Sequence, residues 1–371
     1  MSAKKILMAC SNSWTSTFQV GSHHLAREFI KLGYEVAFLT DPISPFHLLQ
    51  SEGLKERFSI YSKGGIQEQG LWAYVPGTLF PPHRKPLLSS EWVHRHWHHL
   101  TFPNVVKKVK EMGFGEVDFI YFDTPIQSFW KDKIKAKKTV FRIADNHAGF
   151  KKATTASLKL EKELIKNVDL VVCSAKNLVE KVKDLGCKAE HLPNGVLFSQ
   201  FMKEAPLPEE FRTIPQPIAI YVGAIEYWFD YDLINKLAED LPQVSFVLIG
   251  PVKENHFENK KNIYLLGPKP YSLIPSYLKS ANVGMIPFNV NRFAKLIHHV
   301  NPLKLYEYMA SGLPVVATSW QELETIDSPA LLSRTYLEFK TNLLKALKNP
   351  KPKQFYQSFA AKHDWSSTAQ N

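Results

Sequence analysis

The stretch HHVNPLKLYEYMASGLPVV, residues 298–316, decides the fold. Asn301 as a cap with Pro302 behind it is typical of a helix start, and Gly312 is typical of a helix end. The apolar residues 315–317 that follow predict a buried strand. A short helix that leads straight into an apolar strand is one unit of an α/β sheet, so the fold depends on whether this unit repeats.

The unit does repeat on the N-terminal side of this stretch. Apolar runs of strand length lie at 4–11, 34–40, 117–123, 138–144, 168–174, 217–225, 244–252, 262–268, 282–288 and 314–318. Segments with helical periodicity lie at 22–33, 158–167, 175–186, 232–240 and 271–281. Because the runs are apolar almost throughout, they are typical of parallel strands covered on both faces.

A chain of 371 residues is too long for one ordinary core, so we expect two domains. The turn LPNGV at 192–196 and the proline-rich stretch 205–217 interrupt the alternation, which restarts after them. We therefore predict an N-terminal domain at 1–200 and a C-terminal domain at 201–355. Residues 356–371 are expected to form a tail that packs back on the N-terminal domain.

Composition narrows the class of protein. The formal net charge of +11 favours anionic partners such as nucleic acid, acidic lipid headgroups or phosphorylated substrates. The lysine-rich run KDKIKAKK at 131–138 is most simply a solvated face, with membrane contact as the alternative. We find no apolar run long enough to span a bilayer, and the three scattered cysteines argue for a reducing compartment.

Lys304 and Glu307 lie one turn apart in the helix of the opening stretch. They could form an ion pair on a solvated face, worth a few tenths of a kcal/mol, or they could be ligands of a site. The loop expected at 289–300 follows a strand and contains no acid, and a helix N-terminus suits a phosphate group. The basic residues of that loop are Arg292, Lys295, His298 and His299.

Two further motifs follow strands of the C-terminal half. Gly223 in VGAI and Gly250 in IGP would each let a ligand approach the backbone closely. The chain contains neither G-x-G-x-x-G nor G-x-x-x-x-G-K-[ST], so a standard dinucleotide site or P-loop is not expected. The D-x-D in FDYD could hold a metal, but Asp232 is more simply a helix cap.

In the N-terminal half, Asp145 ends a predicted strand in FRIADNHAG, residues 141–149. A carboxylate there could be a general base, and an Asx turn or helix cap is an equally good interpretation. The segment 71–103 breaks the alternation and is dense in aromatic, histidine and proline residues. Its part WVHRHWHHL could bind zinc, but no cysteine or acid supports that, and an interfacial helix fits better.

The stretch NPLKLYEYMASGLPVVAT, 301–318, resembles the donor-site signature of GT-B glycosyltransferases. The segments SAKNLVEKV, LPNGV, YVGAI and LIGP accompany it in the order that this family has. Within the family the chain is similar to the membrane-associated bacterial glucuronosyltransferases of the xanthan-synthesis type, less clearly so before residue 100. The resemblance implies an α/β fold of two Rossmann-like domains that face each other across a cleft.

The resemblance also implies roles for single residues. Lys304 would contact the donor diphosphate, Glu307 the ribose or nucleoside, and Gly223 would line the cleft under the transferred sugar. Asp145 would deprotonate the acceptor hydroxyl for an inverting displacement. Met285 and Phe288 would lie near the uracil pocket. Many retaining members carry a second Glu where this chain has His299, which favours inversion.

We therefore expect a glycosyltransferase that moves a sugar, such as glucuronic acid, from a UDP-sugar to a lipid-linked saccharide. Trp92, Arg95 and Trp97 would belong to an acceptor or membrane face. No tightly bound cofactor or metal and no nucleic acid is expected, and the site of action would be the cytoplasmic face of the cell membrane. Two alternatives are a UDP-sugar epimerase on the same fold and, on charge alone, a basic nucleic-acid-binding protein.

Overall fold

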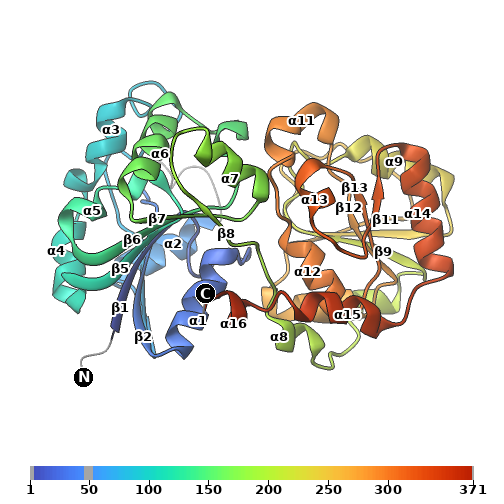
Figure 1. Ribbon diagram of the computed structural model, residues 1–371. Helices are drawn as coiled ribbons and strands as arrows, with labels where there is room; N and C mark the ends of the chain where they lie inside the picture. Colours follow the sequence, from blue (N-terminus) through green and yellow to red (C-terminus); the bar gives the residue numbers. More distant parts are fainter. Residues whose placement is uncertain (1–3, 46–52, 370–371) are drawn as a thin grey trace. The chain divides into compact units, whose positions relative to one another are not determined.

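The computed structural model describes residues 4–45 and 53–369 of the chain. The chain divides into two compact units, Met1–Pro193 and Asn194–Asn371. Both units are α/β, as the sequence predicts (Figure 1). The boundary lies slightly before the predicted one, because the turn at 192–196 already belongs in part to the second unit: Val196 hydrogen-bonds to His363.

The N-terminal unit is built on an eight-stranded sheet with the order β3-β4-β2-β1-β5-β6-β7-β8. The pair β3–β4 is antiparallel and the other neighbouring strands are parallel. Its strands are β1 Lys4–Cys10, β2 Tyr34–Thr40, β3 Ile66–Glu68, β4 Leu71–Tyr74, β5 Glu116–Phe122, β6 Lys135–Ile143, β7 Leu170–Cys173 and β8 Glu190–His191.

α-Helices, 3-10 turns and the π-helical turn η3 connect these strands. They are α1 Gly21–Lys31, α2 Gly53–Ser62, α3 Glu91–His96, η2 Trp97–Leu100, α4 Val105–Val109, η3 Lys110–Phe114, η4 Pro125–Gln127, α5 Trp130–Lys133, η5 His147–Gly149, α6 Thr155–Asn167 and α7 Lys176–Lys183. The segment 71–103, expected to break the alternation, in fact begins with a strand, β4, which is fully buried beside β2. Its four residues are too few to show a period in the sequence.

The C-terminal unit is built on a six-stranded parallel sheet with the order β11-β10-β9-β12-β13-β14. Its strands are β9 Ile218–Val222, β10 Ser245–Ile249, β11 Ile263–Gly267, β12 Val283–Ile286, β13 Val315–Thr318 and β14 Leu331–Ser333. Its helices are α8 Phe198–Met202, η6 Glu209–Arg212, α9 Tyr231–Asp240, η7 Tyr271–Leu273, α10 Ile274–Lys279, α11 Val290–Ile297, α12 Leu303–Ala310, α13 Gln321–Thr325, α14 Tyr336–Lys348, α15 Lys353–Ala361 and α16 Trp365–Thr368.

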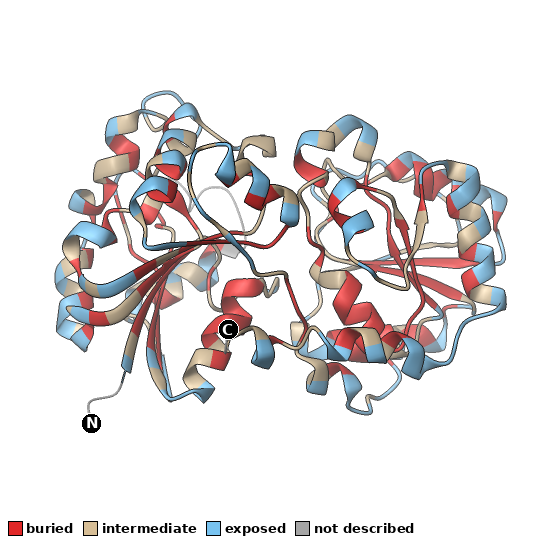
Figure 2. Cartoon of the chain, viewed as in Figure 1, coloured by how far each residue is buried: buried red, intermediate tan, exposed pale blue. Residues whose placement is uncertain are grey.

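In each unit the buried residues lie on the strands and on the helix faces turned toward them (Figure 2). The expected tail includes most of α15 and all of α16, and its packing within the C-terminal unit is clear. Helix α15 packs against α12, where the rings of Tyr306 and Phe359 stack at 6.0 Å. Trp365 in α16 is completely buried. The tail therefore supports the helix on which Lys304 lies.

Candidate functional site

Lys304 brings a positive charge to the carboxyl ends of strands β9 and β12. Its Nζ atom lies 5.1 Å from the ring centre of Phe288, which follows β12, and 5.4 Å from that of Tyr221 in β9. A Cβ atom on Gly223, the first residue after β9, would lie 3.4 Å from the same nitrogen. Cations over aromatic faces are stabilised electrostatically, so the two rings help to hold the ammonium group in place. A lysine near bare backbone and a helix N-terminus suits a phosphate group.

The strands β9 and β10 are each followed by a glycine, Gly223 and Gly250, so no side chain projects from the backbone at these two positions. Both have φ +146°, a conformation that other residues adopt only with strain. The Gly223 N–H donates to the Ile249 carbonyl at 2.8 Å, and a Cβ on Gly250 would lie only 1.9 Å from the Gly223 oxygen. The two backbones therefore touch at a point where no side chain fits, and the bare backbone of Gly223 faces the Lys304 side chain.

Glu307, one turn after Lys304, is buried and has a partner of its own. The Tyr271 hydroxyl donates to its Oε1 atom at 2.7 Å. Burial raises the pKa of Glu307, while the Tyr271 hydrogen bond and the nearby Lys304 charge act in the opposite direction. A buried carboxylate oriented in this way is unlike a solvated surface pair. Sequence reasoning missed Tyr271, because a tyrosine at the start of a short helix carries no signal of its own.

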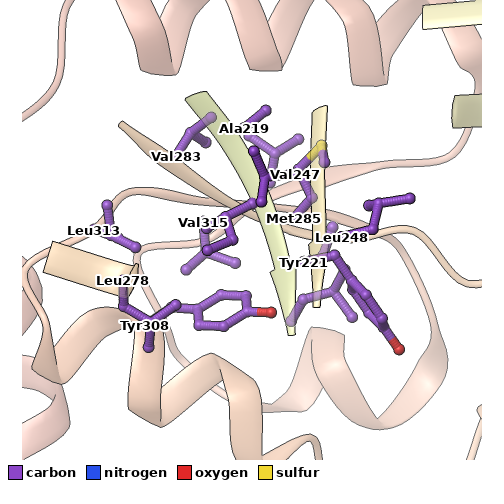
Figure 3. Close-up of a cluster of buried hydrophobic side chains, with 14 of the residues drawn as sticks. Ala219, Tyr221, Val247, Leu248, Leu278, Val283, Met285, Tyr308, Leu313 and Val315 are labelled. Atoms are coloured by element: carbon purple, nitrogen blue, oxygen red, sulfur yellow. The ribbon is translucent and has the colours of Figure 1, made fainter. Parts of the chain in front are cut away.

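Tyr308 anchors helix α12 to the sheet. The Val222 N–H donates to its hydroxyl at 2.7 Å, and a Cβ on Gly284 would lie 2.3 Å from its ring. In Figure 3, Tyr308 and Tyr221 lie at the end of the apolar cluster opposite to Ala219 and Val283, which is the carboxyl end of β9. The position of Lys304 is therefore set by buried contacts one turn further along the same helix.

Asn301, the predicted cap of α12, does not cap the helix. The residue at the cap position is Pro302, and the helix begins at Leu303. The Asn301 side chain accepts from the Asn194 N–H at 3.2 Å and from the Tyr306 hydroxyl at 3.1 Å, and it is buried. The cap prediction was wrong because these tertiary partners hold the asparagine amide away from the helix N–H groups.

Met285 and Phe288 were predicted near the base of the donor nucleotide. Met285 is fully buried within the apolar cluster of Figure 3, so its side chain supports the sheet rather than lining a surface. Phe288 is nearly buried, packs against Trp320 at 5.5 Å, and lies under the Lys304 ammonium group. Of the two, Phe288 is the one placed beside the candidate site.

The segment 289–300 was expected to be a loop, and that was wrong. Residues Val290–Ile297 form helix α11, capped by Asn289, whose side chain accepts from the Arg292 N–H at 3.1 Å. Asn289 was read as part of a basic loop rather than as a cap. His298 accepts from the Gln321 N–H at 3.2 Å and so ties the end of α11 to α13.

The D-x-D stretch forms a helix start, although at a different residue from the predicted one. Asp230, not Asp232, caps α9 by accepting from the Leu233 N–H at 3.0 Å. Within residues 4–45 and 53–369 there is no cluster of three or more histidine, cysteine or acidic residues arranged to hold a metal. His98 of the histidine-rich stretch instead stacks on Phe129 at 4.0 Å, and burial lowers its pKa to about 4.

Asp145 lies two residues beyond the carboxyl end of β6, in a loop that is fixed on both sides. Before it, the Ser174 hydroxyl donates to the Ala144 carbonyl at 2.6 Å. After it, Asn146 is buried and accepts from Lys181 at 2.8 Å, and His147 lies 3.0 Å from the Glu161 carboxylate. Asp145 itself is only partly buried. The strand end thus presents this carboxylate from a rigid base.

Trp92 and Arg95 lie on the surface of the N-terminal unit, whereas Trp97 does not. Trp92 is 59% exposed. Arg95 is held by Glu91 at 2.8 Å and by Glu163 at 2.7 Å, so its charge is shared with two carboxylates. Trp97 is completely buried and donates its indole N–H to the Ile126 carbonyl at 2.8 Å. We therefore leave Trp97 out of any acceptor or membrane face.

The lysine-rich run 131–138 lies at the amino end of β6, the edge of the sheet opposite to Asp145. Lys137 lies 2.7 Å from Asp118, and Lys135 lies 2.9 Å from Glu116. These lysines are largely exposed, and such pairs contribute little to stability. The run is thus a solvated face with paired charges, which agrees with the simpler of the two interpretations.

An apolar pocket in the N-terminal unit was not predicted. It lies where the chain follows β2 and β4, and strand-like bonds bring residues 77–79 and 100–102 together around it. Its lining residues are Ile43, Ser44, Pro45, Phe58, Tyr61, Gly77, Thr78, Leu79, Leu100 and Phe102. Phe102 is 81% exposed and Leu79 57% exposed, so the rim is apolar as well. Exposed apolar groups around a pocket mark a binding surface.

Two family models match the chain, one in each unit. Residues 8–174 match the model described as "Glucuronosyltransferase GumK, N-terminal domain". Residues 216–349 match the model described as "Glycosyl transferases group 1". Each unit thus matches a domain of glycosyltransferases, and the N-terminal unit matches the GumK type. The GumK-type match spans Asp145 and the apolar pocket, and the second match spans Lys304 and Glu307.

Among curated proteins, the chain is similar to the putative teichuronic acid biosynthesis glycosyltransferase TuaH of Bacillus subtilis. The two are 26% identical over 183 residues, which is 46% of this chain. The match spans 45% of the relative, less than half of its length.

Solved structures show the same fold over nearly the whole chain. Sucrose-phosphate synthase from Thermosynechococcus elongatus has a TM-score of 0.68 at 13% identity, covering 99% of this chain and 96% of that one. Anabaena HepE in complex with UDP-glucose has a TM-score of 0.64 at 14% identity, with coverages of 99% and 97%. At these identities the likeness establishes the two-domain GT-B architecture that the GumK-type resemblance implies.

Proposed function

We propose that this GumK-type chain transfers a sugar from a UDP-sugar to a lipid-linked saccharide in the synthesis of an exopolysaccharide or cell-surface glycan. The observation that carries the proposal is the position of Lys304 over the bare backbone of Gly223, in the unit that matches glycosyltransferases. The GumK-type match of the other unit supports glucuronic acid as the transferred sugar.

On the donor side, Lys304 binds the diphosphate, Glu307 binds the ribose or nucleoside, and Gly223 leaves space for the sugar. The HepE structures with UDP and with UDP-glucose support a uridine nucleotide. As the bond to the sugar breaks, negative charge grows on the departing diphosphate, and the lysine and the N-terminus of α12 stabilise it. This charge stabilisation comes from the chain itself, so no tightly bound metal is needed.

On the acceptor side, Asp145 is the base. It takes the proton of the acceptor hydroxyl while the hydroxyl oxygen attacks the anomeric carbon from the face opposite to the UDP group. One carbon–oxygen bond forms as the bond to UDP breaks, which inverts the configuration. His299 in place of the second Glu of many retaining enzymes supports this stereochemistry.

The apolar pocket and its surroundings support a lipid acceptor at an anionic membrane face. In the chain segment between the lining residues Leu79 and Leu100, Leu87 is 86% exposed, and Arg84 and Lys85 are exposed as well. Apolar side chains that enter the bilayer boundary and cations that meet anionic headgroups are the two attractions of a peripheral protein. Within the described ranges no helix is both long and apolar enough to cross a bilayer. We place the protein at the cytoplasmic face of the cell membrane, with Trp92 and Arg95 near this surface.

The proposal is tested by measuring UDP released from UDP-sugars with and without a lipid-linked acceptor fraction. Release that depends on acceptor, with the sugar recovered on the lipid, is the expected result. Conversion of the donor without acceptor would instead identify an epimerase. A thermal-shift panel of UDP-, GDP- and dTDP-sugars selects the donor beforehand, since a bound donor stabilises the fold by mass action.

A further inference from the structure

Two acids besides Asp145 lie at the carboxyl edge of the N-terminal sheet. Asp41 directly follows β2, and Asp123 directly follows β5. Strands β2 and β5 are the two parallel neighbours of β1, and β6, which leads to Asp145, is the next neighbour of β5. Parallel strands end at the same edge, where ligands of such sheets bind. Asp41, Asp123 and Asp145 therefore belong to one row of carboxylates.

Both carboxylate oxygens of Asp123 accept hydrogen bonds from within the N-terminal unit. The Ser11 N–H donates to its Oδ1 atom at 2.7 Å, and the Ser22 hydroxyl donates to its Oδ2 atom. Ser22 lies in the first turn of α1, so the carboxylate joins the N-terminus of that helix to the end of β1. With both oxygens used in this way, Asp123 acts as a structural group.

Asp41 is held differently, through one oxygen. The Gln127 side-chain N–H donates to its Oδ1 atom at 3.0 Å, and the same amide nitrogen also lies 3.1 Å from the Cys10 carbonyl. Trp130 fixes that amide by donating to the Gln127 oxygen at 3.0 Å. Among residues 4–45 and 53–369, no donor is found for the second oxygen, Oδ2. As a residue, Asp41 is partly buried rather than sealed in the core.

The charges around Asp41 come from several elements. Burial raises its pKa from 3.8 to about 7, and the neighbouring Asp123 raises it as well. The Gln127 hydrogen bond lowers it, as do the charges of Arg57 on α2 and Lys152 on the loop that follows Asp145. Arg57 also donates to the Asp41 carbonyl. Lys152 lies on the loop that follows Asp145, and its charge acts on Asp41, so this loop and Asp41 belong to the same edge of the sheet.

We propose that Asp41 binds a hydroxyl group of the acceptor saccharide through its Oδ2 atom and so orients the acceptor at the edge where Asp145 lies. The assignment rests on the function proposed above. It makes Asp41 an acceptor-binding group, while Asp145 remains the base. Two residues further on, Ile43 already lines the apolar pocket. In this proposal the saccharide of the acceptor contacts Asp41, and its lipid contacts the apolar pocket that begins at Ile43.

The test compares wild type, Asp41→Asn and Asp132→Asn, the last replacing an exposed acid of the same unit. Octyl β-cellobioside is the acceptor probe, and UDP release is followed from the UDP-sugar that gives the largest thermal shift. We expect Asp41→Asn to raise the KM for the probe about tenfold, the effect of losing one hydrogen bond to a charged group, with the donor KM unchanged. We expect acceptor kcat/KM of wild type to change near pH 7 and that of Asp41→Asn not to, and Asp132→Asn should match wild type.

An unchanged KM for the probe, or an equal rise in both KM values together with a lower melting temperature, would overturn the inference and leave the proposed function standing. If wild type releases no UDP with any acceptor, the proposed function fails instead. Calorimetric binding of the probe then decides about Asp41. Equal affinity of wild type and Asp41→Asn, or no binding by wild type, counts against the inference, and weaker binding by the variant alone supports it.

Discussion

Six parallel strands of the N-terminal sheet, β4-β2-β1-β5-β6-β7, have the same order as the six strands of the C-terminal sheet, but the carboxyl edges differ in chemistry. In the N-terminal unit the strands β2, β5 and β6 are followed by the acids Asp41, Asp123 and Asp145. In the C-terminal unit β9 and β10 are followed by the glycines Gly223 and Gly250, and Lys304 lies beside Gly223. An edge of glycine backbone and ammonium suits a diphosphate, whereas an edge of carboxylates suits hydroxyl groups and protons. In the function proposed above, one strand–helix scaffold would serve both halves of a transfer reaction, and the residues just after the strands would decide which half.

The largest effect is expected from Asp145→Asn. The amide cannot take a proton, so kcat should fall by about 10²–10⁴-fold, the usual contribution of a general base. UDP affinity, measured by calorimetry, should stay the same, because the donor ligands lie in the other unit. A variant with full activity would remove Asp145 as the base and reopen the interpretation as an Asx turn.

Lys304→Ala tests the opposite edge. Loss of a charge-assisted contact of about 1.5–3 kcal/mol should weaken UDP binding by about 10- to 100-fold. Lys348→Ala removes an exposed lysine from α14 of the same unit and should bind UDP like wild type. Unchanged UDP affinity in Lys304→Ala would show that the diphosphate binds elsewhere.

Gly223→Ala asks whether the bare backbone matters. The new methyl group would lie 3.2 Å from the Tyr221 hydroxyl and 3.3 Å from Lys304 Cε, in addition to strain at φ +146°. We expect roughly tenfold weaker UDP binding and a loss of about 1–2 kcal/mol in the free energy of unfolding.

The control is Gly186→Ala, at φ +75° with no atom within 4 Å of the added carbon. It should show comparable strain in urea unfolding and unaltered UDP binding. If both variants bind UDP equally well, the effect at Gly223 is strain alone and not lost space for the ligand.

Tyr271→Phe should have a moderate effect. It removes the hydroxyl that donates to the buried Glu307, which costs about 1–3 kcal/mol in the free energy of unfolding. UDP affinity should fall several-fold, since Glu307 loses its fixed orientation, and both are measured by urea unfolding and calorimetry. A variant that is less stable but binds UDP normally would argue against a role for Glu307 in the nucleoside site.

The smallest effect concerns the pH dependence of stability at Asp41. Its pKa is raised to about 7 in the folded chain, so between pH 4 and 7 the folded state holds a proton that the unfolded state has lost. Stability from this group therefore falls as the pH rises through that range. In Asp41→Asn the side-chain oxygen still accepts the hydrogen bond from Gln127, but the amide does not titrate, so its contribution to stability does not fall with pH. Its melting temperature relative to wild type should rise from pH 4 to pH 7 and then level off, and a flat difference would contradict the raised pKa.

Much of the fold followed from local pattern. Apolar runs at 4–11, 34–40 and 244–252 predicted strands because central parallel strands are covered on both faces and have no polar side to hide. The short strands β4 and β14 were not predicted, because three or four residues are too few to show the alternation of apolar and polar residues. Helix α11 was taken for a loop because its cap, Asn289, resembles any loop asparagine until its hydrogen bond to the Arg292 N–H is known.

The sequence by itself determined the strand–helix alternation, the two units and the pair Lys304 and Glu307, because these are local or lie within one short helix. Only the tertiary structure decided that Tyr271 holds Glu307, that Trp97 is core and Trp92 surface, and that Asn301 is a buried link rather than a cap. It also brought Asp41 and Asp123 to the edge that Asp145 occupies. These facts depend on which strands are neighbours in the sheet. Strand order arises from contacts between residues far apart in the chain, such as Ala9 with Asp123 or Leu39 with Gln127.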